Sequence, residues 1–159
     1  MKRLLLLLWV VGVGLFAQIR VGDTFPDMTL PDQFGKKHPV SSEDRMVLIA
    51  FEKDLFLAMS QKFKHEKKGF LKKHAIKVIA DISGIPVFIA RMFAIPKMRT
   101  YPFSILLIRD DSGKRFERRK GKVTLYILQN KKVCDVRFVS PANLDTIITH
   151  DGQKNRAGI

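Results

Sequence analysis

The sequence predicts a single α/β domain, residues 18–150, in which a central mixed β-sheet is flanked by helices and preceded by a β-hairpin. Two observations predict this fold class. Residues 46–51 are apolar throughout, which is typical of a strand covered on both faces, and a pattern of helical spacing follows at once. The length of 159 residues, of which 46% are apolar, allows one core of this kind.

Residues 1–17 are expected to be a signal peptide. Lys2 and Arg3 give a basic start, residues 4–16 form an unbroken apolar stretch, and small residues precede a cut expected after Ala17. The apolar stretch is short for a membrane span. We therefore expect export to a bacterial periplasm or beyond the cell, and a mature form without a membrane span. An uncleaved anchor and a buried helix are the alternatives.

The chain is strongly basic. Its formal net charge is +14, and removing the two charges of Lys2 and Arg3 leaves +12 on the expected mature form. A charge of this size favours anionic partners, such as an acidic envelope protein or an anionic surface, without selecting among them. Many organisms secrete proteins that are basic in general, and this explains the charge equally well. Export and the absence of a recognisable motif both argue against nucleic acid.

Residues 18–42 are rich in turn formers and predict a hairpin across one edge or end of the sheet. His38 within this segment is interpreted as a solvated loop residue. After the strand at 46–51, apolar side chains recur at helical spacing over residues 55–70, with lysines between them. This pattern predicts a helix that packs one face on the sheet and turns its lysines to water.

Residues 83–98 predict a helix that is apolar on nearly every face. Pro86 suits its first turn, Pro96 is expected to stop it, and Arg91 is the only charge between them. Such a helix is either wholly buried or exposes an adhesive surface, and burial is the favoured interpretation. If one face is exposed, it is the expected contact with a partner, a second copy in a homodimer or a membrane. That contact would be made by Phe88, Met92 and Phe93.

The rest of the chain predicts three more strand regions and a helix. Residues 77–82 and 104–108 predict buried strands, and a third strand region begins after Gly121 and includes the alternating residues 132–139. Ser140 and Pro141 suit the cap and first position of a last helix. Residues 151–159 are expected to form a disordered tail.

Residues 114–122, between the last two strand regions, carry six positive charges and one negative charge. A solvated loop is the ordinary interpretation of such a run. The alternative is contact with an anion, for which Arg118 and Arg119 suit best because a guanidinium can pair with two oxygens at once. The candidate anion-binding residues are Lys114, Arg115, Arg118, Arg119, Lys120 and Lys122.

Cys134 is the only cysteine, so the chain forms no internal disulfide. Strand alternation over residues 132–139 places it with Val136 and Phe138 on the apolar side. We therefore expect Cys134 to be a small buried hydrophobic residue and not a reactive thiol.

Three segments carry a resemblance to a known family. They are the lead-in VGDTFPDMTLPDQFGK at 21–36, the turn from strand to helix at 51–59, and the closing hairpin at 123–133. Together they resemble the thioredoxin-like superfamily, especially its peroxiredoxin and TlpA-like branch, over residues 21–149. The resemblance implies a thioredoxin-like fold with an N-terminal β-hairpin, and it implies that the basic segment borders the active site.

The redox residues of that family are replaced. The resemblance places a CxxC pair at Phe56 and Met59, a peroxidatic cysteine at Met59 with its proline and threonine at Glu52 and Phe56, and the cis-proline near Val123. A thioether cannot form the thiolate that thiol chemistry needs. We interpret these four residues as vestigial active-site positions of a redox-inactive member. The YPFS run at 101–104 is also similar to YtfJ-like periplasmic proteins, which lack the cysteine pair.

The sequence therefore favours a non-catalytic binding module with basic and apolar surfaces, without cofactor or metal site. A thiol oxidoreductase or peroxidase-related enzyme that uses Cys134 or an unrecognised centre is the alternative. An enzyme of another type is a third hypothesis, for which the sequence shows no set of nucleophile, base and orienting group.

Overall fold

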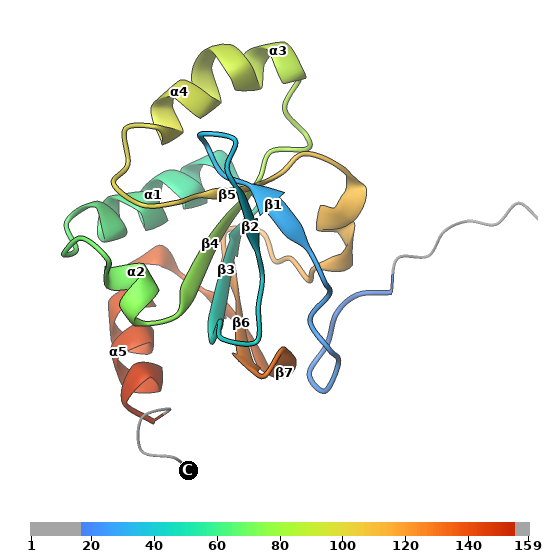
Figure 1. Cartoon of the computed structure of the whole chain (residues 1–159), viewed down its shortest axis with the longest axis vertical. Helices are drawn as coiled ribbons and strands as arrows, with labels where there is room; N and C mark the ends of the chain where they lie inside the picture. Colours follow the sequence, from blue (N-terminus) through green and yellow to red (C-terminus); the bar gives the residue numbers. More distant parts are fainter. Residues whose placement is uncertain (1–16, 155–159) are drawn as a thin grey trace, which may run out of the picture.

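A five-stranded mixed sheet forms the centre of the molecule (Figure 1). In this computed structural model, which describes residues 17–154, the strand order is β5-β4-β3-β6-β7. β3 is parallel to β4, and β4 to β5, whereas β6 is antiparallel to both β3 and β7. The strands are β3 (Met46–Ala50), β4 (Ile76–Asp81), β5 (Leu106–Ile108), β6 (Val123–Gln129) and β7 (Lys132–Val139). This arrangement confirms the predicted fold class.

Separate apolar clusters cover the two faces of the sheet. Met46, Leu48 and Ala50 of β3 belong to a cluster that includes side chains of the helices α1 (Lys53–Lys64) and α5 (Leu144–Lys154). Val47 and Ile49 belong to a second cluster, together with side chains of the N-terminal segment. All of β3 is buried, which confirms the prediction of a strand covered on both faces.

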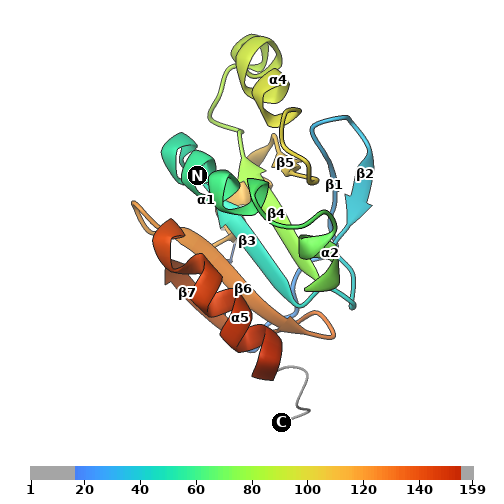
Figure 2. The ribbon, with the colours of Figure 1, turned by 90° about the vertical axis from the view of Figure 1, so that its left-hand side faces the viewer.

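Three helices lie on one side of the sheet (Figure 2). They are α1 (Lys53–Lys64), α2 (Phe70–Lys73) and α5 (Leu144–Lys154), the last preceded by the 3-10 turn η3 (Pro141–Asn143). Helix α5 continues past residue 150, so the start of the predicted tail at residue 151 falls inside the helix. Residues 155–159 of that tail, and residues 1–16 of the predicted signal peptide, lie outside the described residues.

The N-terminal hairpin consists of β1 (Thr29–Pro31) and β2 (Lys37–Pro39), which pair in antiparallel register. Its turn is closed by buried Asp32, whose Oδ1 accepts hydrogen bonds from the backbone N–H groups of Phe34 and Lys36, each at 2.9 Å. Asp32 Oδ2 lies 2.8 Å from Nε2 of His38. The interpretation of His38 as a solvated loop residue is therefore wrong, because a buried carboxylate recruits the ring.

Hydrogen bonds also set the acidity of Asp32. Burial alone would raise its pKa, but the bonds from His38 and from the backbone of Phe34 and Lys36 together outweigh burial and lower the pKa below its ordinary value. The neighbouring Gln33 joins the hairpin to the sheet, since its side chain donates to Phe103 O at 2.7 Å and accepts from Ile105 N at 2.8 Å.

A second long helical segment spans residues 87–98 and is called here the α3–α4 helix. It consists of α3 (Val87–Ile89), the π-helical turn η1 (Ala90–Ala94) and α4 (Ile95–Met98). Pro96 does not stop this helix, contrary to the prediction. In the wide π turn the N–H of Ile95 donates to Ala90 O, five residues back, and Pro96 then occupies the first turn of α4, where its missing N–H is tolerated.

The predicted burial of the α3–α4 helix is also wrong. The exposed fractions of Phe88, Met92 and Phe93 are 68%, 53% and 63%. Only Ala90, Ile95 and Met98 of the helix are buried against the rest of the described chain. Among residues 17–154, no helix is long and apolar enough to cross a membrane.

Cys134 is exposed, whereas the sequence predicted burial. The strand alternation fails because the pairing of β6 with β7 shifts register between Ile127, which faces Asp135, and Leu128, which faces Val133. Cys134 is the extra residue of this bulge, so Val133 rather than Cys134 turns into the core.

Candidate functional site

A cleft of about 730 Å³ opens at the carboxyl ends of β3 and β4. Its walls are the start of α1, the loop after β4 and the inner side of the α3–α4 helix. This volume lies within the range of about 300–1,000 Å³ that is usual for ligand sites. The apolar part of the wall is formed mainly by Phe51, Phe56, Leu57, Ile82, Ile85, Ile89, Phe93 and Met98, and the charged part by Glu52, Lys53, Asp81, Lys97 and Arg118.

Three of the four positions that the resemblance assigns to the redox centre are part of the core. Phe56 is 5% exposed and contacts the Tyr101 ring edge-to-face at a centroid distance of 6.0 Å. Met59 and Val123 are fully buried in the same cluster. A cysteine pair at these positions would have faced the sheet side of α1. The replacements fill that space with apolar side chains, of which Phe56 also forms part of the cleft floor.

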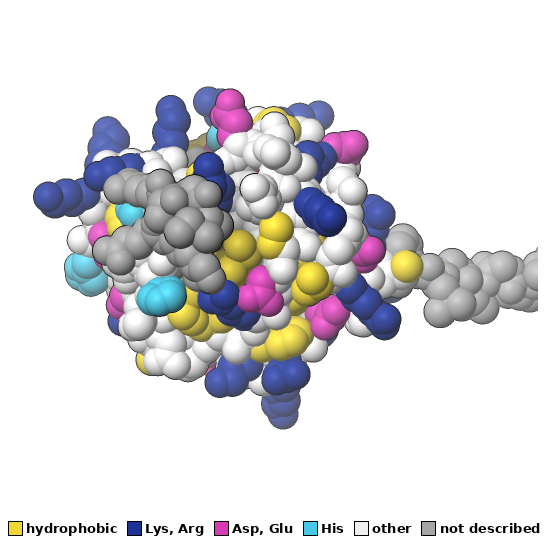
Figure 3. All heavy atoms as spheres, turned by 90° about the horizontal axis from the view of Figure 1, so that it is seen from below, with side chains coloured by type: hydrophobic (Ala, Val, Ile, Leu, Met, Phe, Trp, Pro, Cys, Tyr) yellow, Lys and Arg dark blue, Asp and Glu magenta, His cyan; other side chains and the backbone are white. Residues whose placement is uncertain are grey.

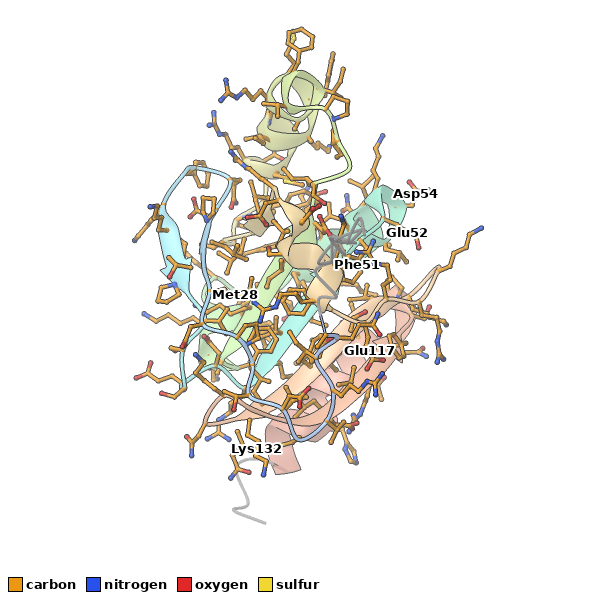
Figure 4. The ribbon with its side chains drawn as sticks, turned by 90° about the vertical axis from the view of Figure 1, so that its right-hand side faces the viewer. Met28, Phe51, Glu52, Asp54, Glu117 and Lys132 are labelled. Carbon is orange, nitrogen blue, oxygen red and sulfur yellow. The ribbon has the colours of Figure 1, made fainter. Side chains whose placement is uncertain are left out.

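The fourth position, Glu52, is exposed and connects two segments. It precedes the first residue of α1, and its Oε1 accepts a hydrogen bond of 2.8 Å from Gly121 N, just before β6. Asp54 in the first turn of α1 suits the positive end of the helix dipole. Figure 4 shows Phe51, Glu52 and Asp54 close together near the start of α1.

Arg118 brings a guanidinium to the cleft. Its Cζ lies 4.6 Å from the centre of the Phe51 ring, a cation–π contact. One Nη atom lies 3.9 Å from Asp81 Oδ2 and 3.4 Å from Gly113 O. Both contacts are long for hydrogen bonds, so an anion in the cleft can compete with them. About half of the Arg118 side chain is exposed, which leaves the group accessible.

Asp81 at the end of β4 is the acidic counterpart of Arg118. Its side chain is 6% exposed, and its Oδ1 accepts hydrogen bonds from the N–H and the hydroxyl of Ser83. A Cβ atom on Gly113 would collide with Asp81 Oδ2, so glycine at this position gives the carboxylate its space. These contacts fix Asp81 and define the side of the cleft from which Arg118 approaches.

The other candidate anion-binding residues do not line the cleft. Lys114 pairs with Asp111 at 2.9 Å, and the Arg119 guanidinium lies 4.4 Å from the Phe138 ring on β7. Arg115 and Lys120 are exposed, and Lys122 is half-buried. The segment that starts with η2 (Asp111–Arg115) therefore separates its charges instead of gathering them in one cluster.

Basic side chains are also spread over the remaining surface. Figure 3 shows the end of the molecule opposite the α3–α4 helix, where Lys and Arg side chains project around the whole outline and Asp and Glu lie between them. The high net charge does not form one basic patch on this face.

Sequence reasoning missed several cleft residues. Lys53 and Lys97 reach the cleft from α1 and α4, and Asp81 lies at the end of a predicted strand. The position of Asp81 was a usable signal, because ligand sites of α/β sheets lie at the carboxyl ends of parallel strands. For Lys97 there was no such signal in the sequence, since this residue follows a proline that was expected to end the helix.

Cys134 lies far from this cleft. Its bulge adjoins Ile127, which pairs with Met46 at the start of β3, whereas the cleft is at the other end of the same strand. Lys132, close to the cysteine in sequence, lies at the lower end of the molecule in Figure 4. Within residues 17–154, no group of three or more His, Cys, Asp and Glu side chains is arranged to hold a metal ion.

Comparison with known proteins gives matches among solved structures alone. No family model matches the sequence, and no curated protein matches it. Peroxidoxin BcpB from Mycobacterium tuberculosis is 17% identical, with a TM-score of 0.59 over 86% of this chain and 98% of that one. A peroxiredoxin-like protein from Aquifex aeolicus is 15% identical, with a TM-score of 0.55 over 86% and 88%.

The thioredoxin domain of a thiol-disulfide oxidoreductase from Bacteroides vulgatus is 13% identical, with a TM-score of 0.54 over 84% of this chain and 99% of that domain. At these identities the likeness establishes the fold, which is thioredoxin-like, as the resemblance implied. The names of these neighbours refer to thiol or peroxide chemistry. The present chain contains one cysteine, which is too few for a pair.

Proposed function

We infer that this protein is an exported, non-catalytic binding module built on a thioredoxin-like fold without a redox-active cysteine pair. One observation carries the inference. The positions that the resemblance assigns to cysteines hold the apolar residues Phe56 and Met59, while the adjoining cleft of about 730 Å³ is open and bordered by a guanidinium. A site that has no thiol but keeps a cleft of ligand size favours binding over turnover.

The wall of the cleft indicates the chemistry of its ligand. Most of the wall is apolar, so the ligand or partner group has an apolar body. Arg118 offers N–H donors at the border, so an anionic group on that body gains a charge-assisted hydrogen bond. Glu52 and Asp81 are held by Gly121 and Ser83, which limits their competition for the guanidinium. The ligand class is therefore an apolar group that carries one anionic substituent.

Anilinonaphthalenesulfonate is a suitable probe because it combines aromatic rings with one sulfonate. Its affinity for the protein is measured by fluorescence titration. Arg118→Gln is expected to weaken binding about tenfold or more, the usual effect of losing a hydrogen bond to a charged group. Lys114→Gln is the matched control, because Lys114 lies in the same basic segment but pairs with Asp111 outside the cleft.

A second pair of variants tests the cleft by filling it. Gly84 lines the cleft, and a Cβ atom built on it meets no other atom within 4 Å. Gly84→Trp is therefore expected to block the probe without disturbing the fold, whereas Gly84→Ala leaves room for it. Probe affinity that is equal in Gly84→Trp, Gly84→Ala and the unaltered protein would overturn the proposed function of the cleft.

Export is the second part of the proposal, and the basic start and apolar run of residues 1–17 support it. Mass spectrometry of the protein recovered from the envelope of its own cells is expected to give a first residue at or near Gln18. An intact N-terminus in the cytoplasmic fraction would contradict export. Kinship with YtfJ-like proteins rests on the YPFS run at 101–104 and stays a prediction.

A further inference from the structure

The α3–α4 helix exposes an apolar face that nothing in the described chain covers. Of the seven large hydrophobic side chains that are exposed among the described residues, five lie on this helix. Single exposed apolar residues are ordinary, but a contiguous group marks a contact surface. The five are Val87 (69% exposed), Phe88 (68%), Ile89 (42%), Met92 (53%) and Phe93 (63%).

The geometry of the helix explains why this face is left uncovered. The π turn brings Ala90, Ile95 and Met98 to one side, where they are buried. A helix that is apolar nearly all round can bury one side against its own domain, so the remaining apolar side chains face outward. Figures 1 and 2 show the helix at one extremity of the molecule, standing apart from the sheet as a convex ridge.

The segment that carries this ridge has charges of one sign. Residues 82–109 include no Asp or Glu, and the cations within this stretch are Arg91, Lys97, Arg99 and Arg109. Arg91 and Lys97 of the helix itself are exposed. The nearby acids Glu52 and Asp81 belong to the cleft wall, where Gly121 and Ser83 bind them. The complementary surface is therefore apolar and anionic.

We propose that the α3–α4 helix docks the protein on an anionic lipid surface. A helix with Phe, Val and Met on one side and cations beside them is typical of segments that lie in the plane of a membrane interface. The apolar side chains enter the boundary between headgroups and acyl chains, while Arg91 and Lys97 contact anionic headgroups. Ile89, Phe93 and Lys97 also line the cleft, so the proposal rests on Val87, Phe88, Arg91 and Met92, which lie outside it and do not depend on its ligand.

A second copy of this chain and a different protein both fit the ridge less well than a lipid surface does. Two copies joined by this face would bring their Arg91 and Lys97 side chains together, and each copy already carries a high positive charge. A stable interface with another protein also involves about 20–30 residues on each partner, more than the five exposed apolar residues of this helix. A convex ridge suits a deformable lipid surface.

The chain that begins at Gln18 is the material for the test. Both apolar clusters of the described chain are formed from Ile19 onward, so this chain keeps its core. It also lacks the only tryptophan, Trp9. Phe88→Trp therefore gives a single tryptophan on the ridge, which can be excited apart from the tyrosines, and Val21→Trp gives one at an exposed site elsewhere. Val21 adjoins Gly22, which binds Val133 at the end of the sheet opposite the cleft.

The probes are vesicles of phosphatidylcholine, with and without about one-third phosphatidylglycerol. With the anionic vesicles, the tryptophan emission of the Phe88→Trp variant is expected to shift to shorter wavelength and to become protected from aqueous quenchers. The emission of the Val21→Trp variant is expected to stay unchanged. Added salt is expected to weaken binding, because the cations act through a screened surface potential.

Flotation of variants separates the apolar and the charged contributions. Phe88→Gln combined with Met92→Gln is expected to lower the partition coefficient at least about tenfold, since two large side chains no longer enter the membrane. Arg91→Gln is expected to lower it about fivefold. Val21→Gln and Lys132→Gln are the matched controls for apolar area and for charge, and they are expected to have no effect.

Several outcomes would overturn the proposal. One is failure to float with anionic vesicles, and another is binding that the Phe88→Gln/Met92→Gln pair leaves intact. If sedimentation shows a dimer that becomes a monomer when Phe88→Gln and Met92→Gln are combined, the face is a contact with a second copy. A fluorescence shift of equal size in the Phe88→Trp and Val21→Trp variants would show that the ridge is not the contact.

Discussion

Helix α1 and the α3–α4 helix border the same cleft but place their apolar side chains in opposite ways. On α1, Leu55, Phe56, Met59 and Phe63 are buried against the sheet, and lysines face water. On the α3–α4 helix, five large apolar side chains face water and three residues are buried. The comparison shows that helix α1 contributes packing, whereas the neighbouring helix offers surface.

The largest expected effect on the free energy of unfolding comes from a change in the buried face of helix α1. Phe56→Ala is expected to lower the free energy of unfolding by about 3–5 kcal/mol, because it removes a buried ring that contacts Tyr101 and leaves a cavity. Urea denaturation followed by circular dichroism measures the change. A loss below about 1 kcal/mol would mean that the site collapses freely and that position 56 is not part of a rigid core.

A second, smaller effect concerns the support of the α3–α4 helix. Its end is held by Arg99, whose Nε donates to Gln33 O at 2.9 Å in the hairpin that Asp32 closes. The pKa of Asp32 is lowered on folding, so its ionised form contributes stability above the ordinary value of 3.8. This contribution is lost as the pH falls through the folded pKa.

The free energy of unfolding is therefore expected to fall less steeply in acid for Asp32→Asn than for the unaltered protein. Phe34→Ala, at an exposed position of the same turn, is the matched control and is expected to keep the acid dependence of the unaltered protein, because it adds and removes no titratable group. If the free energy of unfolding depends on pH in the same way in all three proteins, Asp32 is not the group that secures the hairpin.

The smallest expected effect on the free energy of unfolding comes from a change in the exposed face of the α3–α4 helix. Phe88→Ala is expected to change the free energy of unfolding by no more than about 0.5 kcal/mol, because the ring is 68% exposed. The same urea titration used for Phe56→Ala gives the comparison directly. A destabilisation close to that of Phe56→Ala would show that something covers the ridge and that the two helices do not differ.

The sequence predicted the elements that depend on local pattern. The strand at 46–50 and helix α1 follow from an uninterrupted apolar run and from helical spacing, the turn-rich segment predicted the hairpin, and the resemblance supported the sheet. The exposure of the α3–α4 helix was not predictable in this way. Periodicity shows which side chains can be buried, but not whether the domain has a surface left to cover them.

Three further errors have local physical causes. A π turn accommodates Pro96, a bulge moves Cys134 out of the alternating pattern, and the buried carboxylate of Asp32 recruits His38. Each depends on a contact between residues or on a backbone irregularity that composition and spacing do not encode. For the candidate site, the structure places Arg118 in the cleft wall and distributes the other basic residues elsewhere.

The central claim is that this thioredoxin-like domain acts by binding and not by thiol chemistry. The most direct test measures insulin reduction and peroxide consumption, with a dithiol reductant supplied, for the chain that begins at Gln18 and for its Cys134→Ala variant. We expect both proteins to remain at the background rate, because Phe56 and Met59 stand where the resemblance places the thiols and Cys134 lies at the opposite end of the sheet from the cleft. Turnover by the unaltered chain that Cys134→Ala abolishes would contradict this account.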